Sequence, residues 1–201
     1  MEEIRKKVIK MKIPVEFGSM TFYREWLPLD KKEFRILAMI ADKGEYKGNL
    51  SEICEYLSLN PQTKNRNQIS NSIQALVEQD FVDCIKQGRT YTLKAIPKEK
   101  KIEISRRWAE PIIQHQYTSE SVSWETVLKV LIWIADEHAP IITNDDIAED
   151  LHISTDTIVS AKNVLERDIG AIIKEIEKIT FADGSKRNKG QRLATVADWS
   201  E

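Results

Sequence analysis

The chain contains few of the residues that build disulfide frameworks, metal sites or unusual backbone turns. Its 201 residues include two cysteines, three histidines and seven glycines. Cys54 and Cys84 are too few for a disulfide scaffold, and we expect both to be small buried hydrophobic residues. His115, His138 and His152 lie far apart with no second ligand at metal-binding spacing, so no metal and no cofactor is predicted.

Long apolar runs and a charge excess of one sign are absent as well. The longest apolar run, residues 127–135, is interrupted by Lys129 and falls far short of the ~20 residues that a membrane span requires. The first residues lack the apolar segment and cleavage site of a secretory signal, which predicts a cytoplasmic protein. The 30 Lys and Arg residues nearly balance 32 Asp and Glu residues, and the formal charge of −2 excludes a histone-like polycation.

Motifs of catalysis are also missing. The sequence has no glycine-rich phosphate-binding loop and no nucleophile motif. Asp145 and Asp146 stand at the start of a predicted helix, where an acid caps the helix and interacts favourably with its dipole. We therefore predict that the chain is not an enzyme, and we name no catalytic residues.

One pattern of elements occurs twice along the chain, without similarity residue by residue. The pattern is a helix, a short helix, a helix with one polar face, and a two-stranded hairpin with a basic tip. The predicted fold class is α+β and mainly helical, with two domains that each combine a three-helix bundle with a hairpin. We expect an N-terminal arm or strand over residues 1–28, domains over residues 29–97 and 123–201, and a basic linker over residues 98–122.

Capping residues mark the helix starts in the first copy. Asp30 and Asn49 precede apolar faces of helical period, Gly44 follows the first helix, and Asn60-Pro61 is expected to end the second. Residues 62–79 place four apolar side chains at the spacing of a buried helical stripe, namely Ile69, Ile73, Leu76 and Val77. Residues 81–96 alternate around a turn at residues 87–88, which predicts a hairpin.

The second copy follows the same order. Ser123 is predicted as the N-cap of its first helix, Thr143 or Asn144 as that of the second, and Ser154 or Thr155 as that of the third. Strands are expected near residues 172–181 and 192–197, joined by a long loop. Between the copies, residues 102–113 favour either a strand or a helix, and the sequence leaves the two alternatives open.

Two segments resemble known DNA-binding motifs. Residues 144–165, NDDIAEDLHISTDTIVSAKNVL, resemble a helix-turn-helix, with Ile147 before the turn and Ile158 and Leu165 after it. His152 stands in the turn where the wider family often has Gly. Residues 69–93, ISNSIQALVEQDFVDCIKQGRTYTL, are similar to the recognition helix and wing of winged-helix regulators. The resemblance implies two winged-helix domains, in which the third helix enters the major groove and the hairpin wing follows the backbone or minor groove.

A narrower likeness concerns residues 11–42, MKIPVEFGSMTFYREWLPLDKKEFRILAMIAD. This segment resembles the start of plasmid and phage replication initiators, in which an extended arm precedes two winged helices. The resemblance implies a bacterial or phage protein that acts in DNA replication or transcription regulation.

Basic residues cluster at the two predicted hairpins. Residues 86–107 contain eight Lys and Arg against two Glu, and residues 178–192 contain five against one Asp. Because DNA binding requires cations near phosphates, this clustering favours double-stranded DNA as the partner despite the near-zero net charge.

The polar faces of the third helices supply candidates for base recognition. Arg can bind guanine, and Asn or Gln can bind adenine, through two hydrogen bonds each. The first of these helices has no acid before Glu78. In the second, Asp156 opposes phosphate binding, and its part in base recognition stays open. The candidate DNA-binding residues are Lys64, Arg66, Asn67, Gln68, Ser70, Asn71, Gln74, Lys86, Arg89, Thr155, Thr157, Lys162, Lys186, Arg187, Lys189 and Arg192.

Several alternatives remain open at this point. A homodimer is one, and the choice between a transcription regulator and a replication initiator of a mobile element is another. A protein-interaction scaffold on the same fold is the alternative function, since chromosome-segregation accessory proteins of bacteria resemble this plan. Trp108, Ile112 and Ile113 would then contact the partner. Trp108 also suits the core or stacking on a nucleotide, and an enzyme with a hidden site is the weakest alternative.

Overall fold

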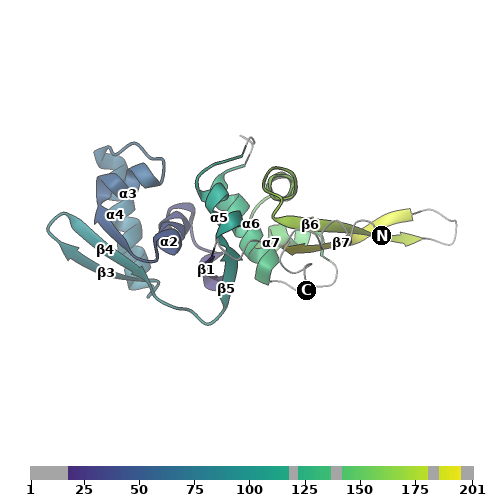
Figure 1. Ribbon diagram of the computed structural model, residues 1–201, viewed down its shortest axis with the longest axis horizontal. Helices are drawn as coiled ribbons and strands as arrows, with labels where there is room; N and C mark the ends of the chain where they lie inside the picture. The colour runs from purple at the N-terminus through teal and green to yellow at the C-terminus, as the bar shows by residue number, and fades with distance from the viewer. Residues whose placement is uncertain (1–17, 118–121, 137–141, 181–185, 196–201) are drawn as a thin grey trace. The chain divides into compact units, whose positions relative to one another are not determined.

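The computed structural model describes residues 18–117, 122–136, 142–180 and 186–195 (Figure 1). The chain divides into two compact units. We call Met20–Lys101 the first unit, and the described residues outside this range the second unit. Both units combine helices with antiparallel strands, so the prediction of an α+β fold class is confirmed.

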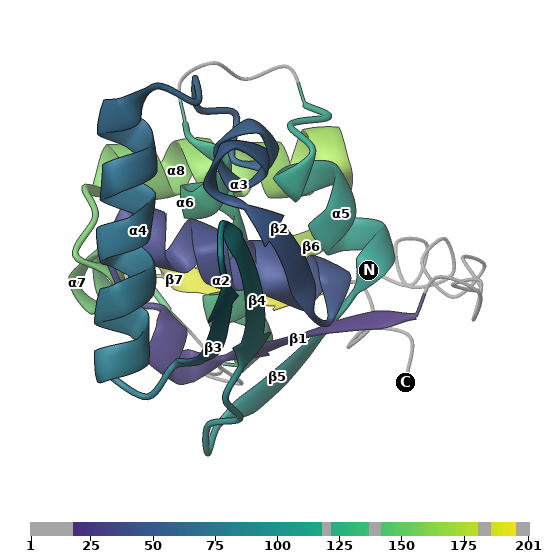
Figure 2. The same cartoon turned by 90° about the vertical axis from the view of Figure 1, so that its left-hand side faces the viewer.

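The first unit contains a three-stranded antiparallel sheet and three α-helices (Figure 2). Its elements are β1 (Ser19–Tyr23), η2 (Arg24–Trp26), α2 (Lys31–Lys43), β2 (Tyr46–Asn49), α3 (Leu50–Tyr56), α4 (Thr63–Glu78), β3 (Val82–Gln87) and β4 (Thr90–Ala95). β4 lies between β2 and β3. The strand that precedes α3 therefore pairs with the returning strand of the hairpin.

The predicted N-caps of the first unit are confirmed. The Asp30 carboxylate accepts hydrogen bonds from the backbone N–H groups of Lys32 and Glu33, at 2.7 and 2.8 Å. Asn49 and Glu52 form a capping box, in which the Asn49 side chain accepts from the backbone of α3 and Glu52 Oε2 accepts from Asn49 N at 2.9 Å. These bonds satisfy N–H groups that have no partner inside a helix.

Several helices end in a Schellman motif with a non-glycine residue in the left-handed conformation, which the sequence does not predict. α3 ends at Tyr56, ahead of the predicted stop at Asn60-Pro61, because Ser58 takes a left-handed conformation with φ 57°. Leu59 N then donates to Cys54 O, and Ser58 N to Glu55 O, the two bonds of a Schellman motif. The same pair of bonds closes three further helices of the described chain, with Asp80, His115 and His152 in the left-handed position.

Two features of the first unit differ from the prediction. β2 was not predicted, because its four residues YKGN show no alternation of polar and apolar side chains and its pairing depends on β4. Val77 is 38% exposed, whereas Ile69, Ile73 and Leu76 are buried. The expectation for Val77 is wrong because eight residues along a helix turn a side chain by about 80° from Ile69, to the edge of the stripe.

The second unit repeats this order of elements. They are β5 (Lys101–Ser105), α5 (Arg106–Ile113), α6 (Trp124–Asp136), α7 (Asn144–Leu151), α8 (Thr155–Asn163), the π-helical turn η3 (Val164–Ile169), β6 (Ile172–Thr180) and β7 (Lys186–Thr195). Ile142 forms an antiparallel bridge with Gln191 of β7. This bridge corresponds to the pairing of β2 with β4. Thr143 and Ser154 are the N-caps of α7 and α8, as two of the stated alternatives predict.

The segment between the copies contains both a strand and a helix. Residues 98–122, expected as a linker, include β5 and α5 in succession. Trp108, Ile112 and Ile113 of α5 are buried. Their burial removes them as contacts in the scaffold alternative, and an indole that is 6% exposed is too covered to stack on a nucleotide.

The second hairpin is longer than expected. β7 begins at Lys186, whereas the sequence places a loop up to Gln191 and a strand from Arg192. The ladder shifts register between Glu177 and Lys178, and this bulge lets the polar residues after Lys186 continue the pairing. No helix within the described ranges has the length and hydropathy that a bilayer span needs.

Cysteine and tryptophan side chains follow the predicted distribution in most places. Cys54 is buried and Cys84 is half-buried, and neither forms a disulfide. Burial raises the pKa of both thiols. Trp26 is fully buried and meets the Phe22 ring edge-on, with ring centroids 6.1 Å apart. Both side chains therefore belong to the core of the first unit.

A side chain at Gly48 in β2 is expected to displace two neighbouring side chains. A Cβ atom there would collide with the Glu52 carboxylate and the Tyr46 ring, and so would displace the acid of the capping box. We expect Gly48→Ala to lower the free energy of unfolding by about 1–3 kcal/mol, measured by urea denaturation.

Lys47→Ala is the matched control, because Lys47 is the exposed neighbour in the same strand. Its effect should stay within about 0.5 kcal/mol. Equal stability of the two variants would contradict the role assigned to Gly48.

Candidate nucleic-acid interface

The exposed face of α4 is a continuous polar stripe. Lys64, Asn67, Asn71 and Gln74 are exposed and succeed one another by three or four residues, so they share one side of the helix. Arg66, Gln68 and Ser70, which we also predicted as DNA contacts, are half-buried on the flanks of this stripe. The structure thus divides the predicted set into a central and a flanking group.

Neighbouring residues hold some of these side chains. Arg66 Nη2 donates to Thr63 Oγ1 at 3.3 Å, and Gln74 Nε2 donates to Glu78 Oε1 at 2.9 Å. Glu78 places a negative charge at the C-terminal end of the stripe. The N-terminal two thirds of α4 therefore offer the more favourable surface for a phosphate backbone.

The hairpin beside α4 presents two of the predicted cations. Figure 2 shows α4 standing next to β3 and β4. Arg89 is exposed at the tip, where Gly88 turns the chain with φ 61°. Lys86 is exposed, and its Nζ lies 5.2 Å from the centroid of the Tyr91 ring. Lys86 and Tyr91 face each other across the ladder, so the ring limits where the ammonium group can point.

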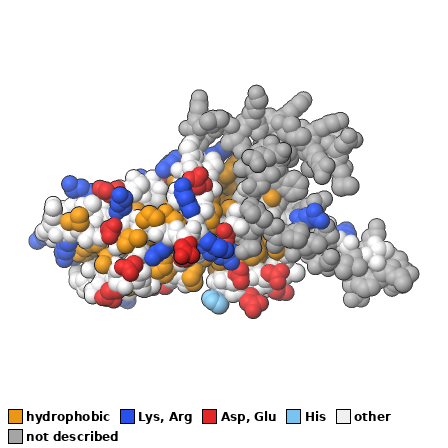
Figure 3. Space-filling view, turned by 90° about the horizontal axis from the view of Figure 1, so that it is seen from below, with side chains coloured by type: hydrophobic (Ala, Val, Ile, Leu, Met, Phe, Trp, Pro, Cys, Tyr) orange, Lys and Arg blue, Asp and Glu red, His pale blue; other side chains and the backbone are white. Residues whose placement is uncertain are grey.

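The surface around this hairpin has mixed charge. On the surface of the first unit, seen on the left of Figure 3, Lys and Arg side chains lie among Asp and Glu. Asp83 pairs across the ladder with Lys94, and both are exposed. A mixed surface attracts DNA only weakly without specific contacts.

The N-terminus of α8 differs from that of α4. Thr155 Oγ1 donates to Asp145 Oδ1 at 2.9 Å, and the Thr157 hydroxyl lies 2.7 Å from that of the N-cap Ser154. The hydroxyl groups that we predicted as phosphate contacts are therefore half-buried and engaged within the protein. Asp156 and Val159 are the exposed side chains of this turn and the next.

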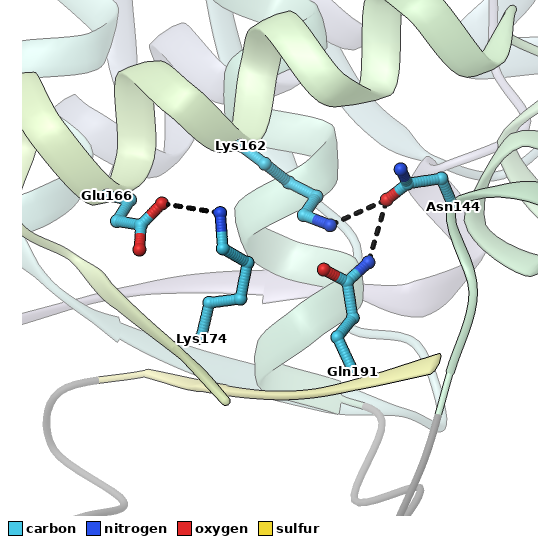
Figure 4. Close-up of polar contacts among 5 residues, drawn as sticks. All are labelled: Asn144, Lys162, Glu166, Lys174 and Gln191. Carbon is cyan, nitrogen blue, oxygen red and sulfur yellow. Dashed lines mark hydrogen bonds and ion pairs between the residues drawn. The ribbon is translucent and has the colours of Figure 1, made fainter. Parts of the chain in front are cut away.

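Lys162 is the clearest correction to the predicted site. Its side chain is 3% exposed, so it does not belong to the outer face of α8. Lys162 Nζ donates to Asn144 Oδ1 at 2.6 Å, and Gln191 Nε2 donates to the same oxygen at 2.7 Å (Figure 4). Beside this group, Lys174 forms an ion pair with Glu166 at 2.8 Å.

The surroundings of Lys162 disfavour its charged form. Burial, and to a smaller extent the positive charge of Lys174, lower the pKa of Lys162 to about 8, while the Glu166 carboxylate opposes the shift. The amine joins α8 to the start of α7 and, through Asn144, to β7. Its role in the structure is to hold the helix pair and the hairpin together.

Sequence reasoning missed Asn144 and Gln191 as partners in this link. They lie 47 positions apart and carry ordinary polar side chains, so no local pattern marks them. Among the predicted contacts of the second hairpin, Arg192 is exposed. The side chains of Lys186, Arg187 and Lys189 lie outside the part of the chain that the structure describes.

Comparison with known proteins gives no family for the chain, because no family model and no curated protein matches it. Within the described ranges, no group of His, Cys, Asp and Glu could hold a metal ion. The candidate interface therefore rests on the geometry of α4 and its hairpin.

The buried lysine is expected to make stability depend on pH. The unfolded chain keeps the Lys162 proton up to pH 10.5, whereas the folded chain loses it near pH 8, so the free energy of unfolding rises between these values. The rise due to Lys162 is at most about 3 kcal/mol. Lys162→Met lacks this titration, so its stability relative to the wild type should fall as the pH rises from 7 to 10.

Urea denaturation at several pH values between 7 and 10 measures this difference. Lys178→Met is the control, since Lys178 is an exposed lysine of β6. A difference between Lys162→Met and wild type that stays constant over this range would show that the folded protein keeps Lys162 charged.

Proposed function

We propose that the chain binds double-stranded DNA at specific sequences through its first unit. In this proposal α4 enters the major groove, and the β3–β4 hairpin follows the sugar-phosphate backbone. The supporting observation is the presence, on adjacent elements, of an exposed amide stripe and two exposed cations. Side-chain amides bind base edges, and cations bind phosphates.

The order of elements supports a winged-helix assignment for both units. Each has a helix, a short strand or bridge, two further helices and a hairpin, and the short strand pairs with the returning strand of the hairpin. We assign the hairpins as wings and α4 and α8 as the third helices on this basis. A fold alone does not define a function, so the proposal rests on the side chains of α4 and its hairpin.

We assign the second unit a supporting role in DNA binding. Its third helix exposes Asp156, its cation Lys162 is buried, and its N-terminal hydroxyl groups are engaged. Arg192 and the basic residues of the second hairpin would add phosphate contacts without base recognition. Regulation of transcription and initiation of replication in the cytoplasm are both uses of such a protein, and neither requires catalysis by this chain.

A protein-interaction scaffold is the second candidate function. The observation in its favour is that both units expose large hydrophobic side chains, namely Val77 at 38% and Ile85 at 61% in the first unit and Val159 at 39% and Ile176 at 49% in the second. Selection from random duplexes at low salt separates the candidates. Enrichment of a common sequence supports DNA binding, whereas a stable complex of two copies in sedimentation, without enrichment, favours the scaffold.

Arg89→Ala tests the assignment of the first hairpin. Because a phosphate contact is independent of base sequence, we expect weaker binding to a selected duplex and to unrelated duplexes by the same factor. The slope of log affinity against log salt concentration should fall by about 0.9 in magnitude. Fluorescence anisotropy at several salt concentrations measures both quantities.

Lys47→Ala serves as the control for Arg89→Ala. Lys47 is an exposed cation of β2, the strand of the same sheet that lies outside the β3–β4 hairpin. It should leave the salt slope unchanged. If removal of Arg89 changes neither affinity nor slope, the hairpin does not contact DNA.

A further inference from the structure

The polar side chains of α4 differ in whether they already have a hydrogen-bond partner within the protein. Asn65 Nδ2 donates to Asn60 O at 2.7 Å, Arg66 is bonded to Thr63, and Gln74 is bonded to Glu78. Asn67 and Asn71 are both exposed, and among the described residues neither amide has a hydrogen-bond partner. They lie one turn apart at the middle of the polar stripe.

An unengaged amide has a specific complement among the DNA bases. It offers one oxygen acceptor and one NH₂ donor side by side. In the major groove, adenine presents a donor at N6 beside an acceptor at N7, so one amide forms two hydrogen bonds with it. Guanine presents two acceptors there, and an amide can satisfy only one of them. The side chain suited to guanine, Arg66, is half-buried and held by Thr63.

The spacing of the two amides sets the spacing of the bases. Four residues of an α-helix rise by about 6 Å. Stacked base pairs are separated by about 3.4 Å along the duplex. Asn67 and Asn71 therefore reach bases about two steps apart when the helix lies along the groove.

We infer that the DNA target of this protein contains two adenines, one or two base pairs apart, whose major-groove edges are bound by Asn67 and Asn71. This inference rests on the proposed function, and it adds the class of base that α4 recognises. Lys64, one turn before Asn67, then lies where a phosphate closes the N-terminal end of the contact. Glu78 keeps the other end of the helix away from the backbone.

Substitution of single atoms in the DNA tests the inference. The full chain is first used to select a binding duplex from a random pool at low salt. Each adenine of the selected site is then replaced in turn by 7-deazaadenine, which lacks the N7 acceptor, and each guanine by 7-deazaguanine. We expect two adenine positions at which affinity falls about tenfold, and no such guanine position.

Protein variants connect the two sensitive positions to the two side chains. Asn67→Ala and Asn71→Ala should each bind the selected duplex about tenfold more weakly. Each variant should also become insensitive to 7-deazaadenine at one of the two adenine positions, and the position should differ between the variants. Asn65→Ala is the matched control, since its amide is held by Asn60 O. It should keep the full pattern of sensitivity. Thermal denaturation of Asn67→Ala and Asn71→Ala should match the wild type, because both side chains are exposed.

The possible failures are distinguishable. A selected site that is sensitive to 7-deazaguanine and insensitive to 7-deazaadenine would overturn the adenine assignment and leave DNA binding by α4 intact. Sensitivity to 7-deazaadenine that persists in both Asn67→Ala and Asn71→Ala would assign the adenines to other side chains. Selection without any enriched duplex would overturn the proposed function, and this inference with it.

Discussion

The pairing of a short strand with the returning strand of the hairpin is the constraint on which both units depend. In the first unit Tyr46–Asn49 pairs with β4, and in the second Ile142 pairs with Gln191. An isolated two-stranded hairpin is marginally stable in water, and the added strand ties it to the helix that follows. In each unit the helix that precedes the hairpin and the hairpin itself are thereby held on one framework.

Much of the helical structure was predictable because its signals are local. Asp30 and Asn49 each bond to N–H groups within three residues, so a sequence pattern specifies them. The missed features depend on distant partners. β2 requires a strand more than 40 positions away, and the burial of Lys162 requires Asn144 and Gln191 from two other elements. A lysine on a polar helix face looks like a surface residue until its partners are known.

The candidate interface was predictable in composition but less so in detail. Residue types indicated a polar face on α4, and the structure places that face outward. Residue types alone did not separate Arg66 and Gln74, which neighbours hold, from the unengaged amides. The net charge of the chain is only −2, and the surface of the first unit likewise mixes basic and acidic side chains. Such a surface favours recognition through a few directional bonds over non-specific attraction.

The left-handed residues at the helix ends have an evolutionary consequence. Ser58, Asp80, His115 and His152 occupy a conformation that costs a side chain about 1 kcal/mol and costs glycine almost nothing. Within the described residues, four helix ends thus have a side chain where glycine would cost less, in a chain that has seven glycines. Natural proteins are selected to exceed a stability threshold, not to maximise stability. Substitution by glycine at any of these four positions would therefore add stability that could offset destabilising changes elsewhere in the protein.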